Sequence, residues 1–233
     1  MQGSSVCRIL IVDNTANSKN AQFTPQLIKI LSAIAHVTVV TSRHQVFQCL
    51  NVMNFDGAIL SGSQHTLTDH ISTDIVAMNA AVLQVNVPVL GICFGMQCMA
   101  LLAGAHVQRL SETCKGIHHV VVDPLSTLMH NECAFDTYHE HDDAVFTLPQ
   151  GYRKIAKLAN PKHDAIVAFE NDKLYRYGVQ FHPEAESLNE RILQRFVDLC
   201  IKKKNPSLAT PLWFITGCVV ASQVVELVRR GRQ

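Results

Sequence analysis

The chain contains four short, almost wholly apolar segments that end in polar or glycine-containing turns: residues 8–13, 37–41, 57–60 and 89–92. Between them, residues 25–35 and 74–85 place apolar side chains at helical spacing. Continuous apolar strands are typical of sheets covered on both faces, and strands that alternate with helices pair in parallel. The sequence therefore predicts an α/β fold with an open, mostly parallel sheet flanked by helices.

Three polar or reactive positions follow directly after predicted strands: Asn14, the pair Ser61 and Gly62, and Cys93. In open α/β sheets, ligands bind at the carboxyl ends of the strands. We therefore expect these residues to share one edge of the sheet.

Cys93 lies between Gly91 and Gly95, after an apolar strand and before a stretch with helical periodicity at residues 96–103. This pattern predicts a nucleophile elbow with sulfur in place of a serine oxygen. The glycines allow a sharp turn and a close approach of substrate to the backbone. A thiol at such a turn is expected to be exposed, near a helix start, and easily converted into a thiolate.

A partner for this thiol follows much later in the chain, where His182 and Glu184 flank Pro183. In an extended segment, residues two apart point to the same face, so Glu184 can bind one imidazole nitrogen and leave the other free for a thiol. A nucleophile, a base and an orienting carboxylate are the three groups that covalent acyl transfer needs. The sequence therefore predicts a Cys93, His182, Glu184 triad.

These two motifs together resemble the class I, triad-type, glutamine amidotransferases, and most of all the glutaminase domain or subunit of GMP synthase. The resemblance covers about residues 8–204 and includes two further segments. One is the strand and turn at residues 57–62, and the other, looser, is residues 140–143, which resemble a Ser-His-Gly-Asp loop of that family. The cysteine and histidine motifs are specific as a pair.

The resemblance implies a flavodoxin-like fold and the hydrolysis of glutamine to glutamate and ammonia through a thioester. We expect no cofactor and no metal. It assigns the oxyanion hole to the N–H of Phe94 and to the turn at Gly62 and Ser63. It also assigns glutamine binding to Gln97 and His141. Ammonia would pass to an ATP-dependent synthetase of the ATP-pyrophosphatase type on a separate chain, in purine biosynthesis, with residues 141–143 as candidates for the contact.

Two segments differ from this family. Ser63 and Gln64 replace a glycine and a proline, and a positive φ at Ser63 would cost about 1 kcal/mol. The loop at residues 140–143 carries added carboxylates where ammonia or a partner would pass. Two other function classes therefore remain: a γ-glutamyl hydrolase or peptidase with a related fold and triad, and a non-catalytic binding protein that keeps the residues.

The charge balance and the cysteine pattern limit which ligands, partners and compartment we expect. Lys and Arg number 20 against 19 Asp and Glu, so no basic excess favours nucleic acid. The eight cysteines form no Cys-x-x-Cys pair, and we interpret the close histidine pairs, His118 with His119 and His139 with His141, as ordinary polar residues rather than zinc ligands. The first residues lead directly into a strand, so we expect no signal peptide and a reducing, cytoplasmic compartment.

Beyond residue 105 the pattern changes to shorter strand-like segments: residues 118–122, 165–170 and 175–181. We expect them to form a small antiparallel extension, with a hairpin turn at Asn171 and Asp172, that returns His182 to the elbow. An amphipathic helix at residues 189–204 would close an amidotransferase domain at residues 1–205. Residues 206–233 form an apolar tail, and we favour a helix packed on the domain or on a partner over a membrane span, which needs about 20 apolar residues.

Overall fold

The structure, a computed structural model, describes residues 6–15, 23–52, 54–69, 72–185 and 188–205. Its strands are β1 (Arg8–Val12), β2 (His36–Val40), β3 (Gly57–Leu60), β4 (Val89–Ile92), β5 (Val107–Val122), β6 (Ala134–Val145), β7 (Arg153–Leu158), β8 (Ala168–Asn171) and β9 (Arg176–Val179). Its helices are α1 (Thr24–Ser32), α2 (Arg43–Val52), α3 (Thr73–Val82), α4 (Phe94–Leu102) and α5 (Glu190–Lys204). All these strands form one sheet in the order β2-β1-β3-β4-β9-β8-β7-β5-β6.

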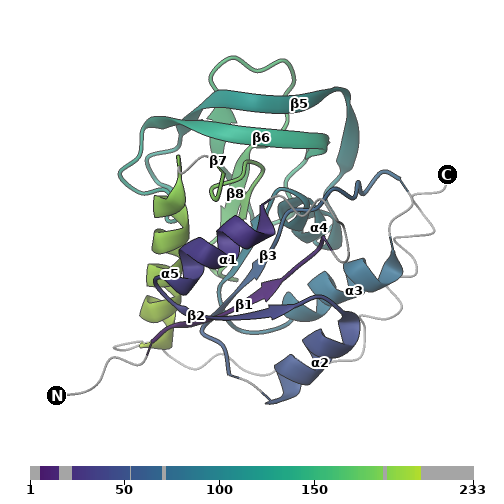
Figure 1. Cartoon of the computed structure of the whole chain (residues 1–233). Helices are drawn as coiled ribbons and strands as arrows, with labels where there is room; N and C mark the ends of the chain where they lie inside the picture. Colours follow the sequence, from purple (N-terminus) through teal and green to yellow (C-terminus); the bar gives the residue numbers. More distant parts are fainter. Residues whose placement is uncertain (1–5, 16–22, 53, 70–71, 186–187, 206–233) are drawn as a thin grey trace.

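The predicted parallel sheet is present. Strands β2, β1, β3 and β4 pair in parallel, and every residue of β3 and β4 is buried. Helices α1 and α5 contribute to one apolar cluster, and α2, α3 and α4 contribute to another. Figure 1 shows α1 and α5 side by side, away from α2 and α3. The α/β architecture with helices on both faces is therefore confirmed.

Strand β9 joins the two kinds of pairing. It is parallel to β4 and antiparallel to β8, with a turn at residues 172–175 at the predicted hairpin position. The expectation that the whole late segment is antiparallel is thus wrong for the contact between β9 and β4. This parallel contact has a direct consequence for the site, because the carboxyl ends of β4 and β9 meet at the same edge of the sheet.

The antiparallel extension is larger than predicted. Strands β5 and β6 form a long hairpin over the molecule (Figure 1), with an irregular register between Arg109 and Cys114. Residues 140–143, expected to form a loop, lie within β6. The strand was missed because its inward positions are mostly polar, so burial alternates along it while hydrophobicity does not: Phe135, Thr137, His139, His141 and Asp143 are all buried.

Helix α2 was also missed, because its helical pattern is weak. Val46 is fully buried and Leu50 packs against the core, but Phe47 on the same short helix is 43% exposed. Helix α5 matches its prediction closely: Asn189 precedes it, and Ile192, Phe196 and Cys200 face the core as expected.

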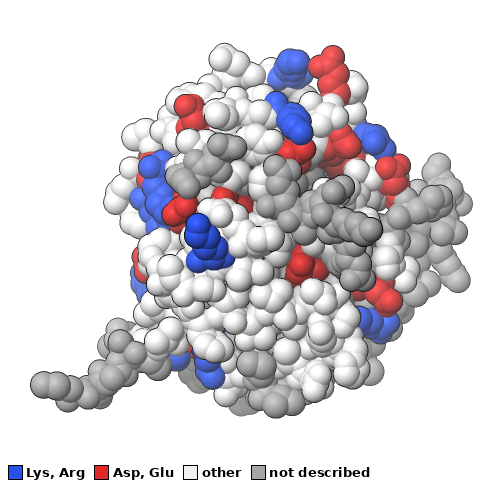
Figure 2. Space-filling view, in the orientation of Figure 1, with Lys and Arg blue, Asp and Glu red and all other residues white. Residues whose placement is uncertain are grey.

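The proposed domain boundary follows residue 205, which is the last described residue, and the tail at residues 206–233 lies outside the described residues. Within the described part of the chain, no helix is both long and apolar enough to cross a membrane. On the face drawn in Figure 2, acidic and basic side chains of the described residues are interspersed rather than gathered by sign.

Candidate active site

Cys93 lies between β4 and α4 with φ 49° and ψ −106°, a conformation that is strained for a residue with a side chain. Its backbone N–H donates to the carbonyl of Val179 at 2.8 Å, which ties the turn to β9. The predicted strand–turn–helix geometry is therefore present, and the strain falls on the cysteine itself rather than on the flanking glycines.

The flanking glycines serve close packing. A Cβ on Gly95 would overlap the backbone carbonyl of Leu60, and a Cβ on Gly91 would lie 2.6 Å from the backbone nitrogen of Met96. Helix α4 therefore approaches β3 and β4 closely enough that only glycine fits at either position. This contact fixes where the helix begins, and hence where the sulfur lies.

We expect Gly95→Ala to lower the free energy of unfolding by about 1–3 kcal/mol or more, because backbone atoms on both sides must move to admit the methyl group. Urea denaturation measures the effect. Gly104→Ala is the matched control: Gly104 has φ +90° with open space around its added Cβ, so that variant carries only backbone strain of about 1 kcal/mol. Equal losses in the two variants would contradict the close-packing argument.

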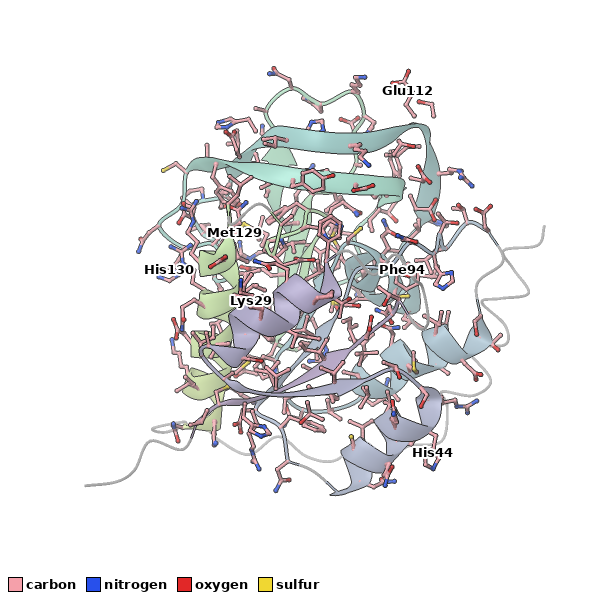
Figure 3. All side chains as sticks on the ribbon, viewed as in Figure 1. Lys29, His44, Phe94, Glu112, Met129 and His130 are labelled. Carbon is pink, nitrogen blue, oxygen red and sulfur yellow. The ribbon has the colours of Figure 1, made fainter. Side chains whose placement is uncertain are left out.

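The thiol of Cys93 is buried, contrary to the expectation of exposure. Only 2% of Cys93 is accessible, and its sulfur lies 3.8 Å from the backbone carbonyl of Glu140 in β6. The β5–β6 hairpin, which the sequence did not predict at its full length, therefore covers the elbow. Phe94, labelled in Figure 3, begins α4 beneath this hairpin.

His182 and Glu184 follow β9, which brings them to the carboxyl end of β4 and so to Cys93. The imidazole Nδ1 of His182 and Oε1 of Glu184 are 2.9 Å apart. A Cβ placed on Gly62 would lie 2.8 Å from Cε1 of His182 and 3.7 Å from Cβ of Cys93, so both side chains border the same point. The pair was predicted from an extended segment, but the structure forms it in a turn, in which the N–H of Ala185 donates to the carbonyl of His182.

Electrostatics favour the charged form of His182. Complete burial lowers the pKa of an imidazole, but hydrogen bonds and charge interactions with Cys93 and Glu184 oppose burial and raise the pKa of His182 to about 10. Glu184 is buried, and its Oε2 has no hydrogen-bond partner among the described residues. The arrangement can therefore hold a protonated imidazole between the Cys93 sulfur and the Glu184 carboxylate at neutral pH.

The turn after β3 is held rigidly by Asn14, as the shared-edge prediction requires. The Asn14 side chain donates to the carbonyl of Ser61 at 2.9 Å and exchanges hydrogen bonds with Asn79. The Ser63 hydroxyl donates to the carbonyl of Asn14 at 3.0 Å. Ser63 is absent from the positive-φ residues of the described chain, so the anticipated strain at Ser63 does not arise.

Phe94, Gly62 and Ser63 all border the cavity that contains Cys93. As the first residue of α4, Phe94 has a backbone N–H without an intrahelical partner. The positions expected to supply the oxyanion donors are therefore beside the thiol. Gly62 is required there by steric proximity to His182 rather than by a positive φ.

The carboxylates at residues 140–143, of which Glu140 and Asp142 differ from the family loop, are paired within the protein. Glu140 binds Lys115 at 2.6 Å, and Asp142 accepts a hydrogen bond from Thr113 at 2.5 Å. The Asp143 carboxylate accepts hydrogen bonds from both the backbone and the hydroxyl of Thr68. These pairs hold the β5–β6 hairpin together and fasten it to the loop after β3.

Gln97, the expected glutamine-binding residue, is buried and lines the cavity. Its amide nitrogen donates to the carbonyl of Asp143 at 2.6 Å and to Oε1 of Gln180 at 3.2 Å. Gln180 in turn directs its amide nitrogen at the Cys93 sulfur, 3.6 Å away. The prediction gave no role to Gln180, although it lies only two residues before His182.

Phe23 was also not predicted as a residue of the site. Its ring lies 4.2 Å from the imidazole of His182, tilted by 30°. No local sequence signal marks it, because the contact depends on how α1 packs over the sheet. Phe23 and His182, together with Cys93, border a cavity of about 310 Å³. His141, the other expected binding residue, lines the same cavity, and its Nδ1 donates to the carbonyl of Asp143 at 2.8 Å.

Comparisons with known proteins show which family the chain resembles. The family model of the class I glutamine amidotransferases matches residues 11–199. The chain is 33% identical over 156 residues to the glutamine-hydrolysing GMP synthase of Nitrosococcus oceani, an overlap of 62% of this chain and 29% of that protein. With the corresponding enzyme of Blochmanniella floridana it is 30% identical over 206 residues, covering 82% of this chain and 37% of the relative.

A solved structure from Thermoplasma acidophilum, identified as one subunit of a GMP synthase, has the same fold. The TM-score is 0.73 at 23% identity, covering 86% of this chain and 96% of that one. The chain thus spans about a third of the length of these curated relatives and nearly all of this solved structure. From the match over most of its length, the chain belongs to the class I glutamine amidotransferases.

Proposed function

We propose that this chain hydrolyses glutamine through a thioester on Cys93 and supplies ammonia to an ATP-dependent synthetase that aminates a nucleotide. The observation that carries the proposal is the convergence of Cys93, His182 and Glu184 on one cavity at the ends of β4 and β9. The GMP synthase relatives support the choice of acceptor.

In the proposed reaction, the Cys93 thiolate attacks the side-chain amide carbon of glutamine. The resulting oxyanion accepts hydrogen bonds from the backbone N–H of Phe94 and from the turn at Gly62 and Ser63. His182, held by Glu184, gives its proton to the nitrogen as the carbon–nitrogen bond breaks and ammonia leaves. The neutral imidazole then takes a proton from water, whose oxygen attacks the thioester and releases glutamate and the thiolate.

Gln97 and His141 are the proposed contacts for the substrate glutamine. Because the amide nitrogen of Gln97 is already bound within the protein, its carbonyl oxygen is the group that we assign to the substrate. Gln180 acts through Cys93 as a positioning residue, since its amide nitrogen lies against the sulfur. A donor in that position helps to hold the sulfur in place for attack.

The partner is proposed as a separate synthetase chain of the ATP-pyrophosphatase type. The chain matches only 29% to 37% of the GMP synthase relatives, and its fold neighbour is identified as one subunit rather than as a whole enzyme. We assign the contact to residues 141–143 and their surroundings, because Asp142 is half-buried at the cavity edge.

The proposed activity is tested by incubating the full chain separately with glutamine and with a γ-glutamyl peptide, and by measuring glutamate and ammonia. Release of ammonia from glutamine, with little peptide cleavage, is the expected result. Preferential cleavage of the peptide would instead favour a γ-glutamyl hydrolase. Absence of both reactions, alone and with a captured synthetase, would favour a non-catalytic relative.

We expect Gly62→Ala to reduce glutamine hydrolysis by about 10²-fold. The added methyl group would lie 2.8 Å from Cε1 of His182, which is too close for two carbon atoms, so the imidazole ring would have to move. Steady-state kinetics measure the loss, and near-native thermal stability would show that the fold is intact. Gly151→Ala, at a turn remote from the cavity, is the control. Full activity of Gly62→Ala would refute the steric coupling between this turn and the imidazole.

A further inference from the structure

A cluster of metal-ligating side chains lies on the inner face of the β5–β6 hairpin. Cys114 pairs with His141 across the two strands, and Gly116 pairs with His139. Directly paired residues of an antiparallel ladder point to the same face, so these side chains converge. One ligand atom from each of Cys114, His139 and His141 lies within 4.8 Å of the others.

Hydrogen bonds fix which nitrogen of His141 carries the proton. Its Nδ1 lies 2.8 Å from the carbonyl oxygen of Asp143, and a carbonyl only accepts. Nδ1 must therefore be the protonated nitrogen. In the neutral ring, Nε2 is left with a free lone pair, directed into the cluster.

His139 can adopt the matching tautomer through Thr137. Nε2 of His139 lies 2.9 Å from the Thr137 hydroxyl oxygen, which also lies 3.1 Å from the carbonyl oxygen of His118. When the hydroxyl donates to that carbonyl it accepts from Nε2 of His139, and Nδ1 of His139 then has the lone pair. Nδ1 of His139 and Nε2 of His141 are 3.4 Å apart in a buried place, so in this tautomer two lone pairs converge on one point.

A cation is the group that these two lone pairs can share, and the third group beside them is a thiol. We propose that Cys114, His139 and His141 bind one divalent transition-metal ion of the Zn²⁺ class. Imidazole and thiolate are the ligands such ions prefer, and a ligating histidine normally donates its other N–H to an oxygen. Both rings have such an oxygen within hydrogen-bond distance of the other nitrogen. On binding, Cys114 releases its thiol proton to solvent. The fourth position is open to His118, whose Nε2 lies 3.7 Å from the Cys114 sulfur.

The proposed ion has a bearing on the amidotransferase site. Glu140 lies between the ligands His139 and His141, and its carbonyl contacts the Cys93 sulfur at 3.8 Å. A metal ion held by the two histidines would fix that stretch of β6 over the elbow. The site shares His141 with the proposed glutamine contacts, so a bound ion and the substrate would compete for its Nε2, whereas Cys114 and His139 have no part in the proposed reaction.

The test is titration of the chelator-treated full chain with Co²⁺, which reports ligand type by its absorption. We expect one equivalent to bind, with a thiolate-to-cobalt charge-transfer band, and Zn²⁺ to displace it. Cys114→Ser should lose the charge-transfer band, and His139→Gln should weaken binding by more than about 100-fold. Thr137→Val leaves all ligands in place but frees the tautomer of His139, and should weaken binding by about 10–100-fold.

Three matched controls keep the result specific. Cys133→Ser removes an exposed thiol of the same hairpin, His119→Ala removes an exposed histidine on its other face, and Cys93→Ser removes the neighbouring nucleophile. All three should bind Co²⁺ as the unaltered chain does. Loss of the band in Cys93→Ser but not in Cys114→Ser would place the ion at the nucleophile and overturn the proposal, as would failure of the unaltered chain to bind any Co²⁺. Circular dichroism checks that each variant is folded.

Discussion

Glutamine hydrolysis is expected to fall by at least about 10⁴-fold when Cys93 is replaced by serine. The two side chains are similar in size, so the fold and the cavity should persist. The chemistry differs, because the replacement removes the sulfur whose charge raises the pKa of His182 and leaves a hydroxyl, which ionises far less readily than a thiol. A serine oxygen would therefore remain protonated and unreactive.

The measurement is glutaminase activity together with labelling by a glutamine-analogue diazoketone, mapped by mass spectrometry. One adduct on Cys93 is expected in the unaltered chain and none in Cys93→Ser. Cys98 provides an internal control, since it is fully buried and burial raises the pKa of its thiol. Cys133→Ser, at an exposed thiol, should retain both activity and the adduct. Labelling at another residue, or residual hydrolysis near the original rate, would contradict the assignment.

The parallel half of the sheet was predictable because its strands are buried on both faces. The runs that became β1, β3 and β4 are nearly all apolar, and no other element explains them in so short a length. The β5–β6 hairpin was not predictable in this way. The inner face of β6 is filled by Thr137, His139, His141 and Asp143, which satisfy one another by hydrogen bonds instead of by apolar contact.

The difference between local sequence patterns and contacts made by distant segments explains which parts of the site were predicted. Cys93, His182 and Glu184 come from compact motifs, and each lies at the end of a strand that the pattern identified. The exposure of the thiol was mispredicted because the hairpin that covers it was not recognised as a pair of long strands. Phe23 and the contact between Gln180 and Cys93 depend on packing between distant segments, for which a single sequence contains no periodic signal.

The meeting of the elbow with the histidine turn depends on one register. Ile92 pairs with Val179 in the parallel contact between β4 and β9, so the residues that follow both strands emerge together. A shift of this register by one residue would direct the alternating side chains of β9 to the wrong face. The strained backbone of Cys93 is held by the hydrogen bond from its N–H to Val179, which belongs to the same ladder. Register and nucleophile geometry are therefore set by a single strand pair.

Replacement of His182 by glutamine is expected to reduce glutamine hydrolysis by about 10³–10⁴-fold, because the departing ammonia loses its proton donor and the attacking water loses its base. Alkylation of Cys93 by iodoacetamide at neutral pH should slow as well, since the positive charge beside the sulfur is removed. His36→Gln, at an exposed position of β2, is the control and should leave both rates unchanged. Unaltered alkylation in His182→Gln would show that the imidazole does not act on the thiol.

The pH dependence distinguishes loss of this charge from loss of packing. The folded chain raises the pKa of His182 from its ordinary value of 6.5 to about 10, so folding favours the protonated ring. The resulting stabilisation is fully present below about pH 6.5 and disappears as the pH rises through about 10. The difference in unfolding free energy between the unaltered chain and His182→Gln should therefore shrink over this interval, as measured by urea denaturation at several pH values. A difference that stayed constant from pH 6 to about pH 10 would mean that His182 contributes only by packing, and that no thiolate–imidazolium pair exists.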